Sequence, residues 1–250
     1  MKIKFLGTNG WYSTNAGSGL CTLVISGPRA IVLDAGDGFH KLSGELEAAG
    51  IREADVFLSH LHLDHCEGLH TLPKLPKGTE VRIFVEEGSY GKLKLLLDAP
   101  FTAPPDNKVM KADVKIVPFR SGERIEYFTS LPLPHSVPDS GFRFGIEGKT
   151  VAYCLDSWPC DNMETLARNA DVFITECSWK PGTKVDSGWQ HMTPELAAGQ
   201  AKAAGAKMLV LTHFGPTDYP ELSDRAKAEK AARKIFPNTI IARDGEALEL

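Results

Sequence analysis

The segment His60-Leu61-His62-Leu63-Asp64-His65 constrains this chain more than any other. It gathers three imidazoles and a carboxylate directly after the apolar run Val56-Phe57-Leu58. Protonated imidazoles at this spacing would repel one another, so the cluster favours a bound cation that keeps the rings neutral. Neutral imidazole and carboxylate are common zinc ligands. The alternative is a histidine-rich surface loop, and the rest of the chain weighs against it.

The composition is that of an ordinary globular protein, with 250 residues, 42% of them hydrophobic and 24% charged. A net charge of −4 argues against a dedicated nucleic-acid binder, whose domain would be basic. The N-terminus has no apolar signal segment, and no apolar run is long enough to cross a membrane. The five cysteines are scattered and never spaced C-x-x-C, which favours reduced thiols, a buried one at Cys66 among them, and a cytoplasmic location.

The hydrophobic pattern predicts alternating strands and helices. Segments 54–60 and 170–176 resemble each other, and a weak duplication would explain the likeness. Two mixed sheets covered outside by helices would accommodate both halves as a single domain over 1–250. Strands are predicted over 2–7, 20–26, 30–34, 55–59, 81–86, 113–118, 123–129, 141–147, 149–155, 171–176, 207–212 and 239–242, and helices over 37–49, 89–97, 161–168, 194–204 and 221–235.

Five predicted strands lead into an acidic or imidazole side chain at their C-terminal ends. Ligand sites of open α/β sheets form at that edge. One such residue would be ordinary strand termination, whereas five beside the histidine cluster indicate a shared site. The five are Asp34, His135, which follows a proline-rich strand over 131–134, Asp156, Glu176 and His213.

His191 joins this edge by a geometric argument. Thr193 has the features of a helix N-cap, and Pro194 those of a first helical residue. If that helix runs antiparallel to the following strand, its start lies beside the strand end at His213. The alternative is a loop histidine next to a cap.

The number of candidate ligands favours two metal ions. A catalytic zinc takes about three protein ligands and a water. Two sites of three, sharing one carboxylate, would use all candidates, and ions roughly 3.5–4 Å apart can hold a bridging hydroxide. Nitrogen and carboxylate ligands suit zinc first and manganese second. The seven candidates are His60, His62, Asp64, His65, His135, Asp156 and His213.

The pattern H-x-H-x-D-H, followed by His135, Asp156 and His213, resembles the metallo-β-lactamase superfamily along the whole chain. The resemblance implies a four-layer αββα sandwich of two mixed sheets with outer helices and a dinuclear site at one edge. His at position 62 favours zinc hydrolysis over di-iron redox chemistry, and Asp34 would support the ligands. The implied ligands are His60, His62 and His135 for one metal, Asp64, His65 and His213 for the other, and Asp156 as the bridge.

This chain resembles one branch of the superfamily more than it resembles the superfamily in general. Segments 5–8, 33–38, 153–160 and 211–214 look like ribonuclease Z and related phosphodiesterases. His191-Met192-Thr193 resembles that branch's motif, whose histidine transfers a proton, and Glu176 matches the acid that orients it. The catalytic residues implied are Asp64, His191 and Glu176.

The chain departs from ribonuclease Z at one place. That enzyme carries a long tRNA-gripping arm between the third histidine and the bridging aspartate. Here only twenty residues separate His135 from Asp156, and they are predicted to form two strands around a turn at 147–149. We therefore expect a small phosphodiester or nucleotide as substrate and do not expect tRNA.

The leading hypothesis is a dinuclear metal-dependent phosphodiesterase in which a metal-bridging hydroxide attacks and His191 protonates the leaving oxygen. Three alternatives stay open: hydrolysis of a lactone, thioester or β-lactam, ribonuclease Z-like RNA processing, and a non-catalytic metal-binding sensor. The sequence leaves open the substrate, the metal and the oligomeric state, a homodimer included. It also leaves open whether Trp11, Tyr12, Trp158 or Trp179 stacks on a base.

Overall fold

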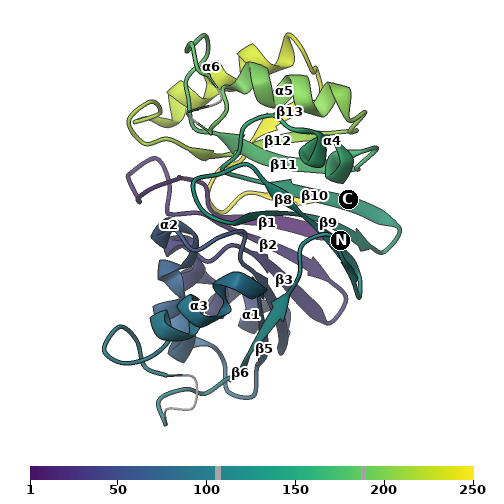
Figure 1. Ribbon diagram of the computed structural model, residues 1–250. Coiled ribbons are helices and arrows are strands. Elements are labelled where there is room, and N and C mark those ends of the chain that lie inside the picture. Colours follow the sequence, from purple (N-terminus) through teal and green to yellow (C-terminus); the bar gives the residue numbers. More distant parts are fainter. Residues whose placement is uncertain (105–107, 187, 189) are drawn as a thin grey trace.

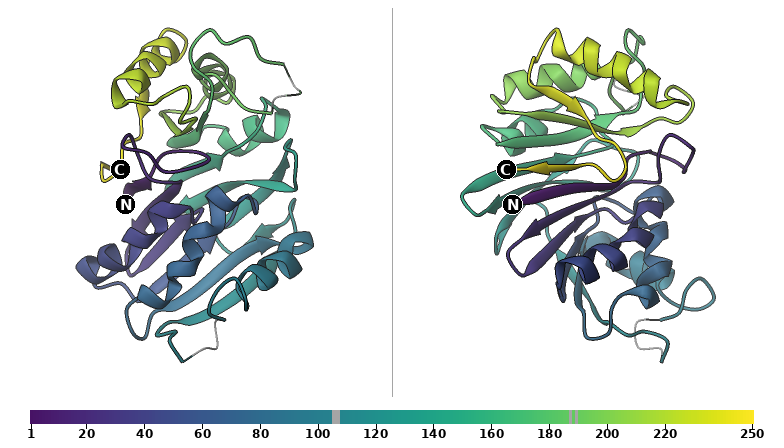
Figure 2. Two further views of the ribbon diagram at one scale, coloured as in Figure 1. Left: turned by 90° about the vertical axis from the view of Figure 1, so that its left-hand side faces the viewer. Right: turned by 180° about the vertical axis from the view of Figure 1, so that it is seen from behind.

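Two seven-stranded sheets pack face to face, and helices cover the outer face of each (Figures 1 and 2). The computed structural model describes residues 1–104, 108–186, 188 and 190–250. Figure 1 shows α1–α3 against one sheet and α4–α6 against the other, with the two termini side by side. The predicted αββα sandwich is confirmed.

The first sheet has the order β14-β1-β2-β3-β4-β5-β6. Its first strands pair antiparallel, and the strands from β3 to β6 pair parallel. The elements are β1 (Lys2–Gly7), β2 (Cys21–Ser26), β3 (Arg29–Leu33), α1 (Leu42–Ala49), β4 (Glu53–Phe57), α2 (Leu63–Cys66), β5 (Glu80–Glu86), α3 (Tyr90–Leu96), β6 (Asp113–Phe119) and the C-terminal β14 (Ala247–Glu249), with 3₁₀ turns at Asp37–Lys41, Glu67–Lys74 and Glu87–Ser89.

The second sheet repeats this plan in the order β13-β12-β11-β10-β9-β8-β7. Strands β7 to β10 pair antiparallel, and β10 to β13 pair parallel. The similar segments around β4 and β11 thus occupy corresponding internal strands, as the duplication predicts. The elements are β7 (Arg124–Ile125), β8 (Phe128–Leu133), β9 (Asp139–Ile146), β10 (Lys149–Cys154), α4 (Asp161–Ala167), β11 (Val172–Cys177), α5 (Pro194–Ala203), β12 (Leu209–Phe214), α6 (Leu222–Arg233) and β13 (Thr239–Ile241).

Three hydrophobic layers hold the sandwich together. One lies between the sheets, and the other two lie between each sheet and its helices. In the middle layer Phe57 stacks on Phe84 at 4.5 Å between ring centroids and meets Phe128 edge-on at 4.7 Å. Burying each such ring stabilises the fold by about 1.5–3 kcal/mol. Because the internal strands are covered on both faces, they appear in the sequence as continuous apolar runs rather than alternating ones.

The helix that follows His191 begins where the sequence predicts. Thr193 caps α5, and its hydroxyl accepts a hydrogen bond from the Leu196 amide at 3.4 Å. Pro194 occupies the first turn, where its missing amide costs nothing. The backbone directly before α5 is therefore fixed relative to the helix.

Two predictions of local structure are wrong, and one short helix was missed. The strand predicted over 123–129 is a hairpin of β7 and β8, because the chain turns at Glu126 with φ of 46°. Glutamate gives no sequence signal for a left-handed turn, unlike Asn or Gly. The short helix α2 was not predicted, since it has only four residues and two of them are candidate ligands. His213 lies inside β12 rather than after it.

None of the helices in the described part of the chain is long and apolar enough to span a membrane. All five cysteines are free, and Cys66 is buried as predicted. The single domain over 1–250 and the cytoplasmic location stay predictions.

Candidate metal centre

The candidate ligands come from both sheets and meet at one edge of the sandwich. His60, His62, Asp64 and His65 follow β4 and run into α2, whereas His135, Asp156 and His213 come from β8, β10 and β12. The turn after β3 makes room for α2, because a Cβ at Gly36 would lie 2.1 Å from the Asp64 carbonyl oxygen. Glycine at this position lets the α2 backbone approach the first sheet.

Three site residues adopt left-handed backbone conformations where their strands end or bulge. These are Asp34, with φ of 57°, Asp156, with φ of 44°, and His213, with φ of 50°. Such conformations cost non-glycine residues on the order of 1–3 kcal/mol and are enriched at functional sites. Asp34 and Asp156 follow the corresponding strands β3 and β10.

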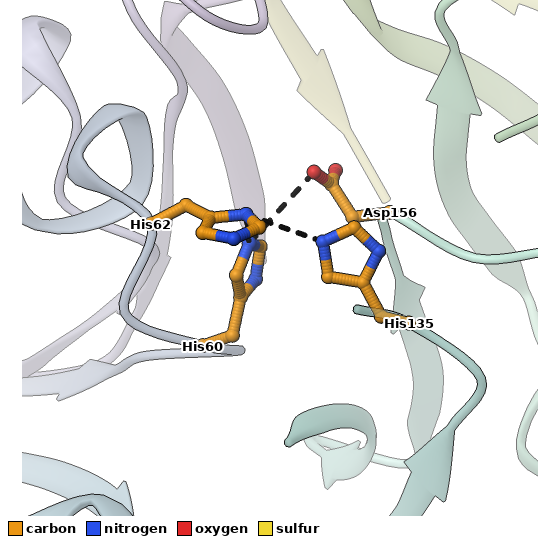
Figure 3. Close-up of side chains that lie close together, drawn as sticks. All are labelled: His60, His62, His135 and Asp156. Carbon is orange, nitrogen blue, oxygen red and sulfur yellow. Dashed lines mark hydrogen bonds and ion pairs between the residues drawn. The ribbon is translucent and has the colours of Figure 1, made fainter. Parts of the chain in front are cut away.

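The first cluster joins three imidazoles and one carboxylate (Figure 3). His62 Nδ1 lies 2.9 Å from His60 Nε2 and 3.2 Å from His135 Nε2. Asp156 Oδ2 is 3.8 Å from His60 Nε2. The ring nitrogens therefore point at a common centre rather than into separate hydrogen bonds.

The second cluster shares Asp156 with the first. His65 Nε2 and His213 Nε2 are 3.2 Å apart. Asp156 places Oδ1 3.1 Å from His213 Nε2 and Oδ2 3.4 Å from His65 Nε2. Asp64 Oδ2 lies 3.4 Å from His213 Nε2. Asp156 is thus the side chain common to both groups, as a bridging carboxylate would be.

The donor set fits a pair of divalent ions. Ligand nitrogens about 2.0–2.1 Å from a tetrahedral zinc lie roughly 3.3 Å from one another, close to the separations in both clusters. Within the described residues, the buried Asp156 Oδ1 and His135 Nδ1 have no hydrogen-bond partner. A bound cation would satisfy Asp156 Oδ1, which lies 3.1 Å from His213 Nε2 without forming a hydrogen bond.

Protonation in the cluster follows burial and charge. Burial lowers the pKa of His60 to about 3 and that of His135 to about 4, which keeps both rings in the neutral, ligand form. Although burial opposes it, the Asp156 and Asp34 carboxylates raise the pKa of His65 well above its usual value. His213 and His65 in turn hold the pKa of Asp156 well below its usual range, against the effect of burial.

Buried partners orient the ligating rings. Asp34 lies 3.0 Å from His65 Nδ1 and accepts hydrogen bonds from the Ser59 amide at 2.8 Å and the Tyr153 hydroxyl at 2.8 Å. Behind His60, Nδ1 lies 3.0 Å from Ser59 Oγ and 3.5 Å from an Asp139 oxygen. Such contacts on the second ring nitrogen fix the tautomer of a metal-binding histidine.

Glu176 and His191 form a separate pair beside the clusters. His191 Nδ1 lies 3.1 Å from both Glu176 oxygens. Glu176 is buried and also accepts hydrogen bonds from the Ser157 amide at 2.8 Å and the Ser178 hydroxyl at 2.6 Å. Although burial opposes it, the Glu176 carboxylate raises the pKa of His191 to about 9. The Glu176 carboxylate therefore favours the imidazolium form of His191.

The structure brings every predicted site residue to this edge, and it adds residues that the sequence did not reveal. Ser59 and Tyr153 were indistinguishable from ordinary strand residues, although Ser59 directly precedes His60. Asp139 lay within a segment noted only for its strands. Ser178 is the clearest omission, because it follows Glu176 by two residues and its Oγ is 3.1 Å from His213 Nδ1.

The clusters open into a cavity of about 430 Å³. Its lining consists of Leu63 and Ser136, the candidate ligands His62, Asp64, His135 and Asp156, His191, and the exposed Trp11 and Tyr12. Within the described chain, Trp158 does not line this cavity. The cavity leaves space for a small substrate directly above the clusters.

Comparison with known proteins places this geometry in context. A family model described as "Beta-lactamase superfamily domain" matches residues 29–214. Ribonuclease Z from Archaeoglobus fulgidus is 27% identical over 306 residues, an alignment that covers 100% of this chain and 97% of that protein. Because this chain has 250 residues, the archaeal protein has residues without a counterpart here. Between His135 and Asp156 the chain forms β9 and β10 with short connections and no arm, as predicted.

Solved structures have the same fold. The metallo-beta-lactamase fold protein YhfI from Bacillus subtilis has a TM-score of 0.80 at 23% identity, covering 99% of each chain. Human tRNase Z, short form, has a TM-score of 0.74 at 20% identity, covering 100% of this chain and 99% of that one. Both ribonuclease Z and tRNase Z are named for RNA processing. These relatives give no support to the expectation that tRNA is not a substrate.

We predict that the purified protein binds about two divalent ions per chain. His62→Ala should lose metal occupancy, because it removes one of three nitrogen ligands in the first cluster, whereas the exposed His70→Ala should keep it. Chelation should lower the melting temperature, since an ion at a hundredfold excess over its Kd stabilises the folded state by about 2.7 kcal/mol. Elemental analysis and thermal unfolding measure both effects. Full occupancy in His62→Ala would remove His62 from the ligand set.

Proposed function

Because the chain belongs to the beta-lactamase superfamily and is a metal-dependent hydrolase, we propose that it hydrolyses phosphodiesters of small molecules, with nucleotides as the first candidates. The proposed ligands are His60, His62 and His135 at one ion, Asp64, His65 and His213 at the other, and Asp156 between them. Zinc is the proposed metal, with manganese as the alternative.

The observation that carries this proposal is the pairing of the buried Glu176 with His191, which lines the metal cavity. A phosphodiester with an alkyl leaving group expels a basic alkoxide, which needs a proton as its bond to phosphorus breaks. A thioester expels a thiolate, which needs much less protonation. An imidazolium with a raised pKa, held beside the clusters, therefore favours the phosphodiester.

The chain's own residues supply the proton and hold its donor in place. When bound, the two ions would lower the pKa of a coordinated water and stabilise charge on the phosphoryl oxygens. His191 donates Nδ1–H to Glu176, which leaves Nε2 for the cavity. Nε2–H then passes its proton to the leaving oxygen, so that the alcohol departs neutral. His191 regains a proton from solvent, and the raised pKa favours this step at neutral pH.

RNA is a second candidate substrate, favoured by a specific cavity. A cavity of about 480 Å³ is lined by Lys180, Lys227, Lys230 and Lys234. It shares Asp218 with a smaller cavity that reaches His191. Lys227 Nζ forms an ion pair with Asp224 Oδ1 at 2.7 Å, which weakens the attraction of Lys227 for phosphate. A lysine-lined cavity near the active site would suit the phosphates of a longer chain.

A substrate panel tests the proposed function. We predict that kcat/KM of the metal-loaded enzyme is highest on phosphodiesters, including bis(nitrophenyl) phosphate, cyclic nucleotides and short oligoribonucleotides. A lactone, a thioester and nitrocefin should react at least about 100-fold more slowly, because a two-metal site clamps the attacking and leaving oxygens of an in-line displacement at phosphorus, a geometry that attack on an acyl carbon lacks. A preference for an acyl substrate would contradict the proposed phosphodiesterase function. Efficient cleavage of precursor tRNA would instead favour RNA, the second candidate substrate.

His191→Ala separates proton donation from metal binding. The variant should keep both ions and lose roughly 10²–10⁴-fold in kcat, the usual contribution of a general acid. The loss should be smaller on nitrophenyl esters, whose leaving group needs little protonation. Elemental analysis and kcat on alkyl and nitrophenyl diesters measure the two effects. Loss of an ion instead would make His191 a ligand.

Glu176→Gln should shift the pH profile of kcat. His191 works as an acid only below its pKa, which the Glu176 carboxylate raises to about 9. Removing that negative charge lowers the pKa, so the alkaline limb of kcat should move to lower pH while the shape of the side chain is kept. Glu47→Gln, an exposed carboxylate on α1, is the matched control and should leave the limb in place. An unmoved limb in Glu176→Gln would exclude the pair as the source of that limb.

A further inference from the structure

A second cavity of about 190 Å³ lies directly behind His191. Rings form much of its lining, Trp179 among them, and Trp179 does not line the metal cavity. Trp11, Tyr12 and His191 line both cavities, so the two cavities adjoin at these three side chains. The remaining lining residues are Ser178, Trp179, Gly215, Pro216, Thr217 and Asp218.

Trp11 is held in this position by strained backbone. It has φ of 65°, a conformation that bulky side chains rarely adopt. Its amide donates a 2.7 Å hydrogen bond to Asp64 Oδ2, and the adjacent Gly10 amide donates to the Phe214 carbonyl at 3.1 Å. A Cβ at Gly10 would lie 2.4 Å from the His213 ring, so the loop packs directly on a candidate ligand. The strain is thus maintained by the site itself, while the Trp11 ring stays 62% exposed.

The other wall of the cavity is fixed as well. The Trp179 amide donates to the Met192 carbonyl at 3.1 Å, and the Trp179 carbonyl accepts from the Tyr219 hydroxyl at 2.7 Å. Its position therefore depends on the segment that carries His191. Trp11 and Trp179, whose backbones these hydrogen bonds hold, and the exposed Tyr12, at 52%, offer aromatic faces on which a planar group can stack.

We propose that this aromatic cavity binds the planar base of a nucleoside leaving group. The inference rests on the proposed phosphodiesterase function. His191 stands between the cavities and protonates the leaving oxygen, so whatever that oxygen carries extends into the cavity behind His191. Aromatic walls stack on any base, because every base presents a π-face.

The volume of the aromatic cavity and the charge of its lining further restrict the kind of ligand that it can bind. Drug-sized ligands occupy pockets of about 300–1,000 Å³, so 190 Å³ suits one ring system. Among the described residues, no Lys or Arg lines the cavity, whereas the Asp218 carboxylate does. A second phosphate is disfavoured there, and a neutral base with N–H groups is favoured.

Dinucleoside monophosphates that lack one base test the assignment. Removing the base keeps the sugar oxygen, so the chemistry of the leaving alcohol changes little. In the metal-loaded enzyme, removing the base of the nucleoside released as an alcohol should lower kcat/KM roughly 5- to 150-fold, the effect of losing one base–aromatic stack. Removing the base on the side that keeps the phosphate should change kcat/KM less than about twofold.

Trp11→Ala should abolish most of the difference in kcat/KM between the two base-free substrates. The ring is exposed and its amide bond to Asp64 is a backbone contact, so folding and metal content should be retained. Trp11→Phe should restore much of the discrimination. Phe101→Ala, which removes a ring 63% exposed and remote from both cavities, is the matched control and should keep it. Equal turnover of both base-free substrates by the wild type would overturn the inference and leave the phosphodiesterase standing.

Calorimetric titration with a free nucleoside separates this inference from the proposed function. The metal-loaded wild type should bind the nucleoside, and Trp11→Ala should bind it roughly 5- to 150-fold more weakly. This outcome would support the cavity assignment even if no phosphodiester were hydrolysed. Equal affinity for phenol and the nucleoside, or unchanged affinity in Trp11→Ala, would overturn it.

Discussion

The contact of Asp156 with imidazoles from both sheets is the interaction on which the rest of the site depends. Its two oxygens lie 3.1 Å from Nε2 of His213, in β12 of the second sheet, and 3.4 Å from Nε2 of His65, in α2 beside the first sheet. The two sheets must therefore pack at one fixed distance for the clusters to form. The aromatic layer around Phe57 sets that distance by burying large rings from both sheets. Core packing and site geometry are thus consequences of the same sheet-to-sheet contact.

The sequence predicted this site well because its residues break ordinary rules. A cluster such as His60–His65 has no place in a hydrophobic core, and Asp156 or Glu176 at the end of an apolar strand is conspicuous for the same reason. Residues that only support the ligands gave no such signal. Ser59 and Tyr153 are ordinary strand residues in the sequence, and their role appears only when β3, β4 and β10 are brought together around Asp34.

The errors in local structure have a common physical cause. The β7–β8 hairpin depends on a left-handed Glu126, and the bulge in β12 depends on a left-handed His213. Neither residue type signals such a conformation, because tertiary contacts and not local propensity impose it. Trp11 is a further residue with a left-handed backbone conformation that its residue type does not signal. Where the backbone is strained in this way, the structure and not the sequence reveals that an aromatic ring faces the substrate cavity.

The central claim is that two ions share the Asp156 carboxylate, and anomalous diffraction from crystals of the metal-loaded protein tests it most directly. The account predicts two peaks roughly 3.5–4 Å apart. One should lie among His60, His62 and His135, and the other among Asp64, His65 and His213, with Asp156 between them. A single peak in this region, or two peaks that Asp156 does not contact, would contradict it.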